Sequence, residues 1–123
     1  MKNKAVNLKQ KAALITEHWS PRVVGEVDDH YIKIAKIKGE FTWHDHQEDE
    51  MFLVLEGTVT IQMKTENVSL KKGEFYVVPK GVLHNPVASE ECTLMLFEKK
   101  STLHTGEVKE ELTKDISAQL QPL

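Results

Sequence analysis

The sequence predicts an all-β domain, an antiparallel sandwich or barrel with short helices only at its ends. After Arg22, about nine short runs of β type follow one another, and turn residues interrupt them roughly every 8–12 residues. No stretch between two runs could hold the crossover helix that a parallel sheet needs. The chain has 123 residues, and we expect them to form one domain, residues 1–123.

Each end of the chain predicts a short helix. Near the start, apolar residues recur at helical spacing, namely Ala5, Leu8, Ala12 and Ile15. Pro21 ends this helix, because proline lacks the backbone N–H that the helix interior requires. At the other end, residues 113–120 predict a second short helix, for which Thr113 is the expected N-cap.

Between the helices, seven segments carry the clearest strand signal. They are residues 23–27, 31–37, 51–55, 58–63, 67–70, 75–78 and 92–97. In segment 58–63, Val59, Ile61 and Met63 alternate with polar residues, and this period of two predicts a strand with one buried face. Turn residues such as Gly57 and Pro79 follow directly after several of the segments.

The composition excludes several classes of protein. Lys and Arg number 16 and Asp and Glu number 19, and this net charge of -3 argues against a protein built to bind nucleic acid. The longest uncharged run falls far short of the roughly 20 apolar residues of a membrane span, and the first residues lack the apolar core of a signal peptide. A lone Cys92 excludes an internal disulfide and is expected to be a small buried side chain. We therefore expect a cytoplasmic protein.

Two histidines and a glutamate form the clearest chemical motif. His44 and His46 are two positions apart, so on a strand both imidazoles project from the same face. Glu50 follows with the same parity and can join that face. Imidazole nitrogens and a carboxylate oxygen together suit zinc, iron, manganese, nickel or cobalt. A fourth ligand would come from elsewhere in the chain, and His84, after a Pro-x-Gly turn, is the natural candidate.

The same residues have a structural alternative. A His-x-His pair near a glutamate also occurs by chance in exposed hairpins, and the polar neighbours from Asp45 to Asp49 could form a solvated acidic loop. The other three histidines, His18, His30 and His104, lack ligand-like spacing and are expected to be surface or ordinary hydrogen-bonding residues. No pattern identifies a catalytic acid, base or nucleophile.

The segments 39–57 and 73–88 together resemble the two sequence motifs of the cupin superfamily. In the first segment Gly39, His44, His46, Glu50 and Gly57 match the family's motif, but four residues instead of five separate Gly39 from His44. The second segment matches at glycine, proline, glycine and histidine positions, namely Gly73, Pro79, Gly81 and His84, and it has Ala88 where the family has asparagine. Fifteen residues separate the two segments, as in small single-domain cupins.

The resemblance implies an antiparallel cupin barrel, a jelly roll, with a metal inside. It implies that His44, His46, Glu50 and His84 hold one divalent transition metal per chain, and that the protein is a homodimer with a small-molecule ligand. Three functions stay open: a metal-dependent enzyme of dioxygenase or isomerase type acting on a small polar substrate, a non-catalytic binding or sensing module, and a degenerate cupin. The segment HTGEV, from His104, also resembles small cupins related to mannose-6-phosphate isomerases.

Large side chains on the predicted strands have two interpretations. They are Trp43, Phe52, Met63, Phe75, Tyr76, Met95 and Phe97. The simpler interpretation is that they form the barrel core. The functional one is that some of them line an apolar pocket beside the metal, as in most ligand sites.

Overall fold

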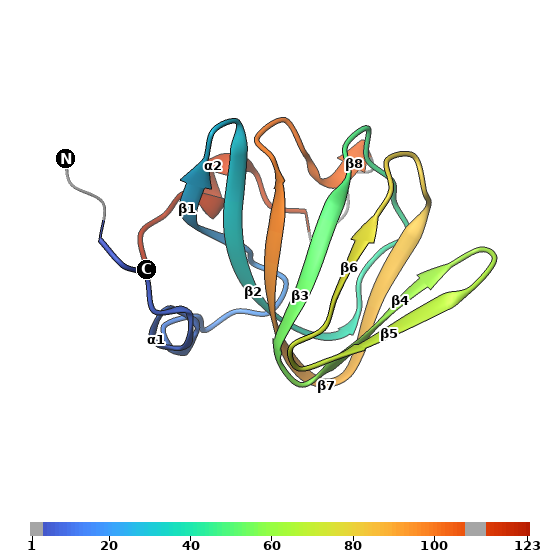
Figure 1. The fold of residues 1–123 in the computed structure, drawn as a ribbon, viewed down its shortest axis with the longest axis horizontal. Coiled ribbons are helices and arrows are strands. Elements are labelled where there is room, and N and C mark those ends of the chain that lie inside the picture. Colours follow the sequence, from blue (N-terminus) through green and yellow to red (C-terminus); the bar gives the residue numbers. More distant parts are fainter. Residues whose placement is uncertain (1–3, 108–112) are drawn as a thin grey trace.

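The computed structural model describes residues 4–107 and 113–123, which form an antiparallel β-structure with two short helices (Figure 1). In chain order the elements are α1 (Leu8–Ala13), β1 (Arg22–Val27), β2 (His30–Glu40), β3 (Glu50–Glu56), β4 (Thr58–Met63), β5 (Asn67–Lys71), β6 (Phe75–Val78), β7 (His84–Lys99), β8 (His104–Glu107) and α2 (Ile116–Gln119). All the strand pairs found are antiparallel. The predicted all-β barrel of the jelly-roll type is confirmed.

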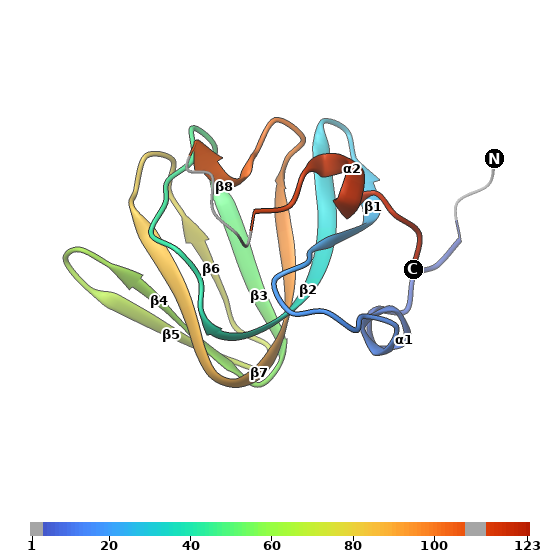
Figure 2. The ribbon, with the colours of Figure 1, turned by 180° about the vertical axis from the view of Figure 1, so that it is seen from behind.

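The long strand β7 joins the two walls of the barrel. Its second half lies between β2 and β3, within the strand order β1-β2-β7-β3-β6. Its first half pairs with β4, and His84 at its start lies opposite Met63. The sequence predicted only residues 92–97 as a strand here, and the structure extends this strand back to His84. Figure 2 shows from behind how the connection between β2 and β3 crosses the barrel beside this first half.

The barrel interior holds the main hydrophobic core. Val59, Ile61 and Met63 are all buried in it, as the alternation in segment 58–63 predicted. A second, smaller cluster lies outside the sheet, where Ala12 and Ile15 pack against Ile34 of β2. In β2, side chains at odd positions such as Ala35 face the interior core, while Ile34 faces α1, because successive side chains on a strand point to opposite faces.

The helix bounds differ from the predicted ones. Helix α1 begins at Leu8, and the side chain of Asn7 caps it by accepting a hydrogen bond from the N–H of Gln10 at 2.9 Å. In the second helix, Asp115 occupies the N-cap position, so the prediction of Thr113 was wrong by two residues. Among residues 4–107 and 113–123, no helix has the length and apolar character needed to cross a bilayer.

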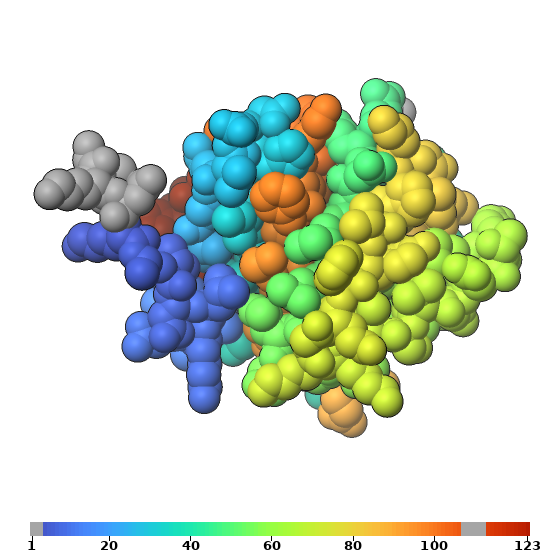
Figure 3. Space-filling view, in the orientation of Figure 1, coloured from blue at the N-terminus to red at the C-terminus, as the bar shows by residue number. Residues whose placement is uncertain are grey.

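Some of the expected core residues lie on the outside. Phe52 and Met63 are buried, but Trp43 is 41 % exposed and Phe75 is 63 % exposed. Phe75 begins β6, the last strand of the order, which pairs with β3 and with no other strand among the residues that the structure describes. Figure 3 shows the outer face on which β2, β7, β3 and β6 lie side by side. The core interpretation is therefore wrong for Trp43 and Phe75.

Candidate metal centre

Four side chains from three separate segments meet inside the barrel. His44 and His46 lie in the connection between β2 and β3, Glu50 begins β3, and His84 begins β7. Their exposed fractions are 2 %, 6 %, 6 % and 0 %. One ligand atom from each residue can be chosen so that all four lie within 4.8 Å of one another. The structure thus brings together the four residues that the sequence singled out, while Asp45, Gln47 and Asp49 between them are exposed.

Main-chain hydrogen bonds place the two histidine segments side by side. The N–H of His44 donates to the carbonyl of His84 at 3.0 Å, and the N–H of His84 donates to the carbonyl of His44 at 2.9 Å. The N–H of Gly81 donates to the carbonyl of His46 at 2.7 Å. The carboxylate of Asp49 accepts from the N–H of Lys80 at 2.9 Å, so this acidic residue holds the turn before His84.

The imidazole rings are oriented by backbone carbonyls. Nδ1 of His44 lies 2.8 Å from the carbonyl of Thr42, and Nδ1 of His84 lies 2.8 Å from the carbonyl of Val82. A carbonyl only accepts, so both Nδ1 atoms carry a proton, and in the neutral form of each ring Nε2 has a free lone pair. This is the tautomer in which a histidine binds a metal through Nε2.

At the centre of the cluster, the carboxylate of Glu50 and the imidazole nitrogens of His46 and His84 face one another without a hydrogen-bond donor between them. Oε1 of Glu50 lies 3.3 Å from Nε2 of His84 and 3.4 Å from Nε2 of His46. With its lone pair facing inward, Nε2 of His84 cannot donate to this carboxylate. Neither ring nitrogen of His46 makes a hydrogen bond with any residue that the structure describes. Buried polar atoms normally have partners. A cation at the centre would satisfy all of these lone pairs, so the donor set fits a metal ion.

The pKa values of His44 and Glu50 are both lowered. Burial lowers the pKa of His44 to about 4, and the neighbouring ring of His84 adds to this effect. Burial raises the pKa of Glu50, but the neighbouring imidazoles of His46 and His84 outweigh this effect and hold the pKa well below its usual value. At neutral pH the cluster therefore offers a neutral His44 and an ionised Glu50, the forms that bind a metal.

A buried polar network adjoins Glu50. Glu98 lies opposite Glu50 in the pairing of β3 with β7. Its Oε1 lies 3.0 Å from Nζ of Lys33, and the same Nζ donates to Oε1 of Gln119 at 2.6 Å. Burial and the negative charge of Glu50 raise the pKa of Glu98 well above its usual value, against the effect of Lys33. Strand periodicity does not reveal this network, because Gln119 comes from the distant helix α2.

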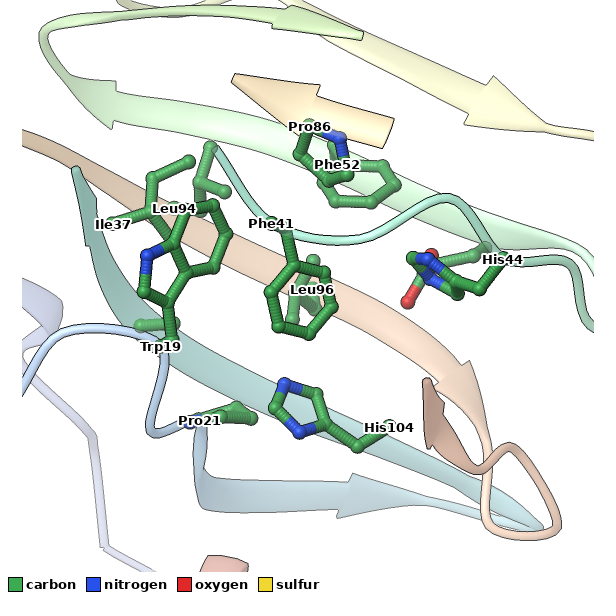
Figure 4. A pocket seen from close by; sticks show the side chains of 12 residues that line it. Trp19, Pro21, Ile37, Phe41, His44, Phe52, Pro86, Leu94, Leu96 and His104 are labelled. Carbon is green, nitrogen blue, oxygen red and sulfur yellow. The ribbon is translucent and has the colours of Figure 1, made fainter. Parts of the chain in front are cut away.

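An apolar cavity of about 40 Å³ extends from the cluster into the barrel (Figure 4). His44 and Glu50 line one part of it, and His104 lines another. The rest of its lining is mostly apolar and includes Trp19, Phe41, Phe52, Pro86, Leu94 and Leu96. Phe52 was among the residues considered for such a pocket, whereas Trp19 and Phe41 were missed because neither lies in one of the predicted strands.

Phe41 connects the parts of this cavity through ring contacts. It stacks on Trp19 with a centroid distance of 4.7 Å and meets the ring of His44 edge-on at 5.4 Å. It also contacts the ring of His104 at 4.9 Å. Trp19 has a positive φ of 58°, which is unusual for a residue with a side chain. Its indole N–H donates to the carbonyl of Lys38 at 2.9 Å, so this polar atom is satisfied.

The remaining histidines fall into two groups. His18 pairs with Glu91 at 2.7 Å and His30 with Asp29 at 2.8 Å, as expected for ordinary hydrogen-bonding residues. His104 accepts a hydrogen bond from the N–H of Lys114, one of the two roles expected of it, and its ring also lines the cavity. No spacing signal marks His104, because the C-terminal segment that fixes its ring lies beyond the strands. Cys92 is fully buried as predicted, and burial raises its pKa to about 11.

A second, wider hollow of about 560 Å³ borders His46 on the other side. Its lining mixes polar and apolar surface and includes the polar side chains of Asp45, Glu48, Lys80 and Ser101. Ser101 donates to Glu48 at 2.7 Å across this region. The cluster therefore borders the apolar cavity through His44 and Glu50 and the wider hollow through His46.

Comparison with known proteins agrees with this geometry. The cupin domain family matches residues 31–99, which include all four residues of the cluster. The chain belongs to the cupin family. The similarity of the His104 segment to mannose-6-phosphate isomerases stays a prediction, and the last residue of that segment, Val108, lies outside the described residues.

Three known proteins are similar to this chain over two thirds of its length or more. The Bacillus subtilis (strain 168) protein named "Uncharacterized protein YdbB" is 37 % identical over 84 residues, which are 67 % of this cupin and 74 % of YdbB. The crystal structure of a cupin-2 domain containing protein from Shewanella frigidimarina NCIMB 400 is 47 % identical, with a TM-score of 0.76 over 77 % of this chain and 94 % of that one. Protein NMB1881 from Neisseria meningitidis is 31 % identical, with a TM-score of 0.73 over 79 % and 100 % of the two chains.

Proposed function

We propose that this cupin binds one divalent transition-metal ion per chain through His44, His46, Glu50 and His84. The observation that carries the proposal is the inward-facing set of lone pairs: backbone carbonyls fix the tautomers of His44 and His84, and the nitrogens of His46 make no hydrogen bond among the described residues. Three imidazoles and one carboxylate, with no thiolate, suit zinc, iron, manganese, nickel or cobalt.

We further propose that the ion serves a metal-dependent reaction on a small molecule, of dioxygenase or isomerase type. When bound, the metal would polarise a substrate oxygen as a Lewis acid. The chain itself supplies the walls: the apolar lining excludes bulk water, and Phe41 holds the ring of His44 from the side. The substrate expected from the sequence was small and polar. The lining favours one whose polar part is confined to the end near the cluster and the end near His104.

A non-catalytic binding or sensing role is the second candidate. Apart from His44 and Glu50, His104 is the only titratable residue in the lining of the cavity, among the residues that the structure describes. An isomerase of the proton-transfer type needs a positioned acid or base. The sparse lining thus favours either chemistry that depends on the metal or binding without turnover.

Metal content separates these proposals from a degenerate cupin. Protein purified without chelator is expected to contain about one transition-metal ion per chain, measured by elemental analysis, or to take up one added divalent ion in calorimetry at neutral pH. Protein that contains no metal after purification, and that also takes up no added divalent ion, would contradict the metal proposal. Substrate screening with the loaded protein, in air and without oxygen, then distinguishes oxidation from isomerisation and from binding alone.

Assembly and location stay predictions. We propose a homodimer, supported by the exposed Phe75 and Val77 on the outermost strand β6. Size-exclusion chromatography with multi-angle light scattering would measure the molar mass of the protein in solution. A monomer at high protein concentration would contradict the proposal. The expected cytoplasmic location and the single domain over residues 1–123 are likewise proposals.

A further inference from the structure

His104 presents an unused hydrogen-bond donor to the apolar cavity. Its Nδ1 lies 2.8 Å from the backbone nitrogen of Lys114, whose N–H can only donate. Nδ1 is therefore the acceptor, and Nε2 must carry the proton of the neutral ring. Among residues 4–107 and 113–123, no group makes a hydrogen bond with this Nε2. Figure 4 shows the ring of His104 in the cavity, next to Phe41 and Pro21.

The other polar side-chain atoms of the cavity already have a role. The indole N–H of Trp19 donates to Lys38. His44 and Glu50 belong to the cluster that we propose holds the metal. The Nε2–H of His104 is thus the one polar side-chain atom left to meet a ligand, among the lining residues that the structure describes. An unpaired donor in an apolar space is costly, and a ligand acceptor would relieve this cost.

We propose that His104 is a ligand-binding residue that donates a hydrogen bond from Nε2 to the carbonyl oxygen of a small, neutral organic ligand. A carbonyl oxygen only accepts, which matches a site that offers a donor and no second polar side chain. The apolar body of the ligand would lie against Phe41, Leu94 and Leu96. This inference rests on the proposed function, because it places the other end of the ligand at the metal cluster.

Two properties of the cavity limit the ligand further. Its volume of about 40 Å³ accommodates only a few heavy atoms, since a cavity that admits benzene is about 150 Å³. Burial lowers the pKa of His104 to about 4. The ring is therefore neutral at neutral pH, which favours a neutral carbonyl over a carboxylate as its partner.

Acetone and 2-methylpropene provide matched probes. They have the same planar shape, and only acetone carries an oxygen acceptor. Binding of each to the zinc-loaded protein is measured by titration in heteronuclear NMR, and contacts of the acetone methyl groups with the rings of Phe41 and His104 are sought by nuclear Overhauser effects. The same titrations are repeated after zinc has been removed with a chelator.

Two variants separate the donor from the shape of the ring. In His104→Asn the short amide can still accept from the N–H of Lys114, but it has nothing at the position of Nε2. In His104→Gln the longer amide places an N–H near that position. We expect His104→Asn to weaken acetone binding about tenfold and His104→Gln to restore most of it, because one hydrogen bond is lost and regained. Binding of 2-methylpropene is expected to change little in either variant.

The outcomes are distinguishable. The proposal is overturned if acetone does not bind the wild-type protein, if His104→Asn leaves its affinity unchanged, or if His104→Asn weakens both probes equally. The Overhauser contacts in the wild-type protein decide the matter if a variant fails to fold. Failure of the metal proposal is seen separately, because the wild-type protein would then bind no zinc. In that case, tighter binding of acetone than of 2-methylpropene by the chelated protein still tests the role of His104.

Discussion

The main chains of His44 and His84 form a reciprocal pair of hydrogen bonds, 3.0 and 2.9 Å long, that ties the two halves of the proposed metal site together. Neither bond involves the imidazole rings. The backbone therefore sets the positions of both side chains before any ion binds, and the ligand atoms need little rearrangement. In a site organised in this way, ordering of the protein on metal binding costs less free energy.

The first prediction concerns His84 and His46. Replacing either by alanine removes one ligand, so we expect each variant to lose the bound metal and the rise in melting temperature that metal produces. A ligand present at a hundredfold excess over its dissociation constant stabilises the folded state by about 2.7 kcal/mol. Elemental analysis and thermal melting with and without chelator measure both effects.

His18 provides the matched control for these variants, because its ring lies outside the cluster and pairs with Glu91. His18→Ala is expected to retain the metal. Chelated wild-type protein and His84→Ala are expected to melt at similar temperatures, since the main-chain bonds to His44 do not depend on the ring. A full equivalent of metal in His84→Ala would show that the second segment contributes no ligand.

The second prediction concerns stability in acid. The pKa of His104 is lowered to about 4 in the folded protein, while the unfolded chain keeps the ordinary value of 6.5. Between pH 6.5 and pH 4, His104 is therefore protonated in the unfolded state but largely neutral in the folded state. The free energy of unfolding consequently falls as the pH falls through this range. This histidine alone accounts for about 3 kcal/mol at pH 4.

Urea unfolding of chelated protein between pH 7 and pH 4 measures this dependence. His104→Asn lacks the titrating ring, so its stability is expected to fall less steeply than that of the wild type. Other groups, such as Glu98, affect both proteins alike and cancel in the comparison. Parallel curves for the two proteins would contradict the lowered pKa of His104.

The third prediction concerns Gly106 in β8. A Cβ at this position would overlap the carbonyl oxygen of Asp45, in the segment that carries His44 and His46. The residue also has a positive φ of 62°. We expect Gly106→Ala to lower the free energy of unfolding by at least about 3 kcal/mol, because backbone strain of about 1–2 kcal/mol is added to a steric clash.

Gly39 isolates the contribution of the backbone. It has a positive φ of 83°, but nothing lies within 4 Å of where its Cβ would be. Gly39→Ala is therefore expected to cost only the backbone strain. Urea unfolding of both variants measures the difference. Equal decreases in the free energy of unfolding would mean that Gly106 is not in close contact with the backbone of Asp45.

The fourth prediction concerns the buried pair of Lys33 and Glu98. Lys33→Met leaves the carboxyl group of Glu98 without its partner, and removing one member of a buried pair costs about 3–5 kcal/mol. Replacing both, as in Lys33→Met with Glu98→Gln, is expected to recover part of this loss. Lys100→Met serves as the control, because its pair with Glu26 is partly exposed and is expected to contribute little to stability. Additive losses in the double variant would show that the two side chains do not interact.

Local periodicity predicted most of the strands but not the full length of β7. Strand β4 followed directly from the alternation of Val59, Ile61 and Met63. In residues 84–91 the apolar alternation fails, because Pro86 and the acidic pair Glu90 and Glu91 interrupt it. Pairing with β4 and β2 nonetheless keeps this stretch extended. Tertiary contacts thus decide where local preference is weak.

The cluster was visible in the sequence because its residues lie at fixed spacings within two short segments. Its surroundings were not. Trp19 and Phe41 lie outside the predicted strands, and His104 reaches the cavity with its ring held by Lys114 of the C-terminal segment. Lys33 appeared as one of many charged residues, and only the fold shows that Glu98 and Gln119 surround it. Contacts between distant segments leave no periodic signal.

The chain of ring contacts from Trp19 through Phe41 to His44 gives the protein an internal optical reporter. The protein contains two tryptophans, and the other, Trp43, is substantially exposed, so the two indoles differ in their emission wavelength. Cobalt, nickel or iron at the cluster would quench the buried indole of Trp19, which the ring of Phe41 links to that of His44. The blue-shifted part of the fluorescence would thus follow occupancy of the proposed metal site in solution, without any added dye.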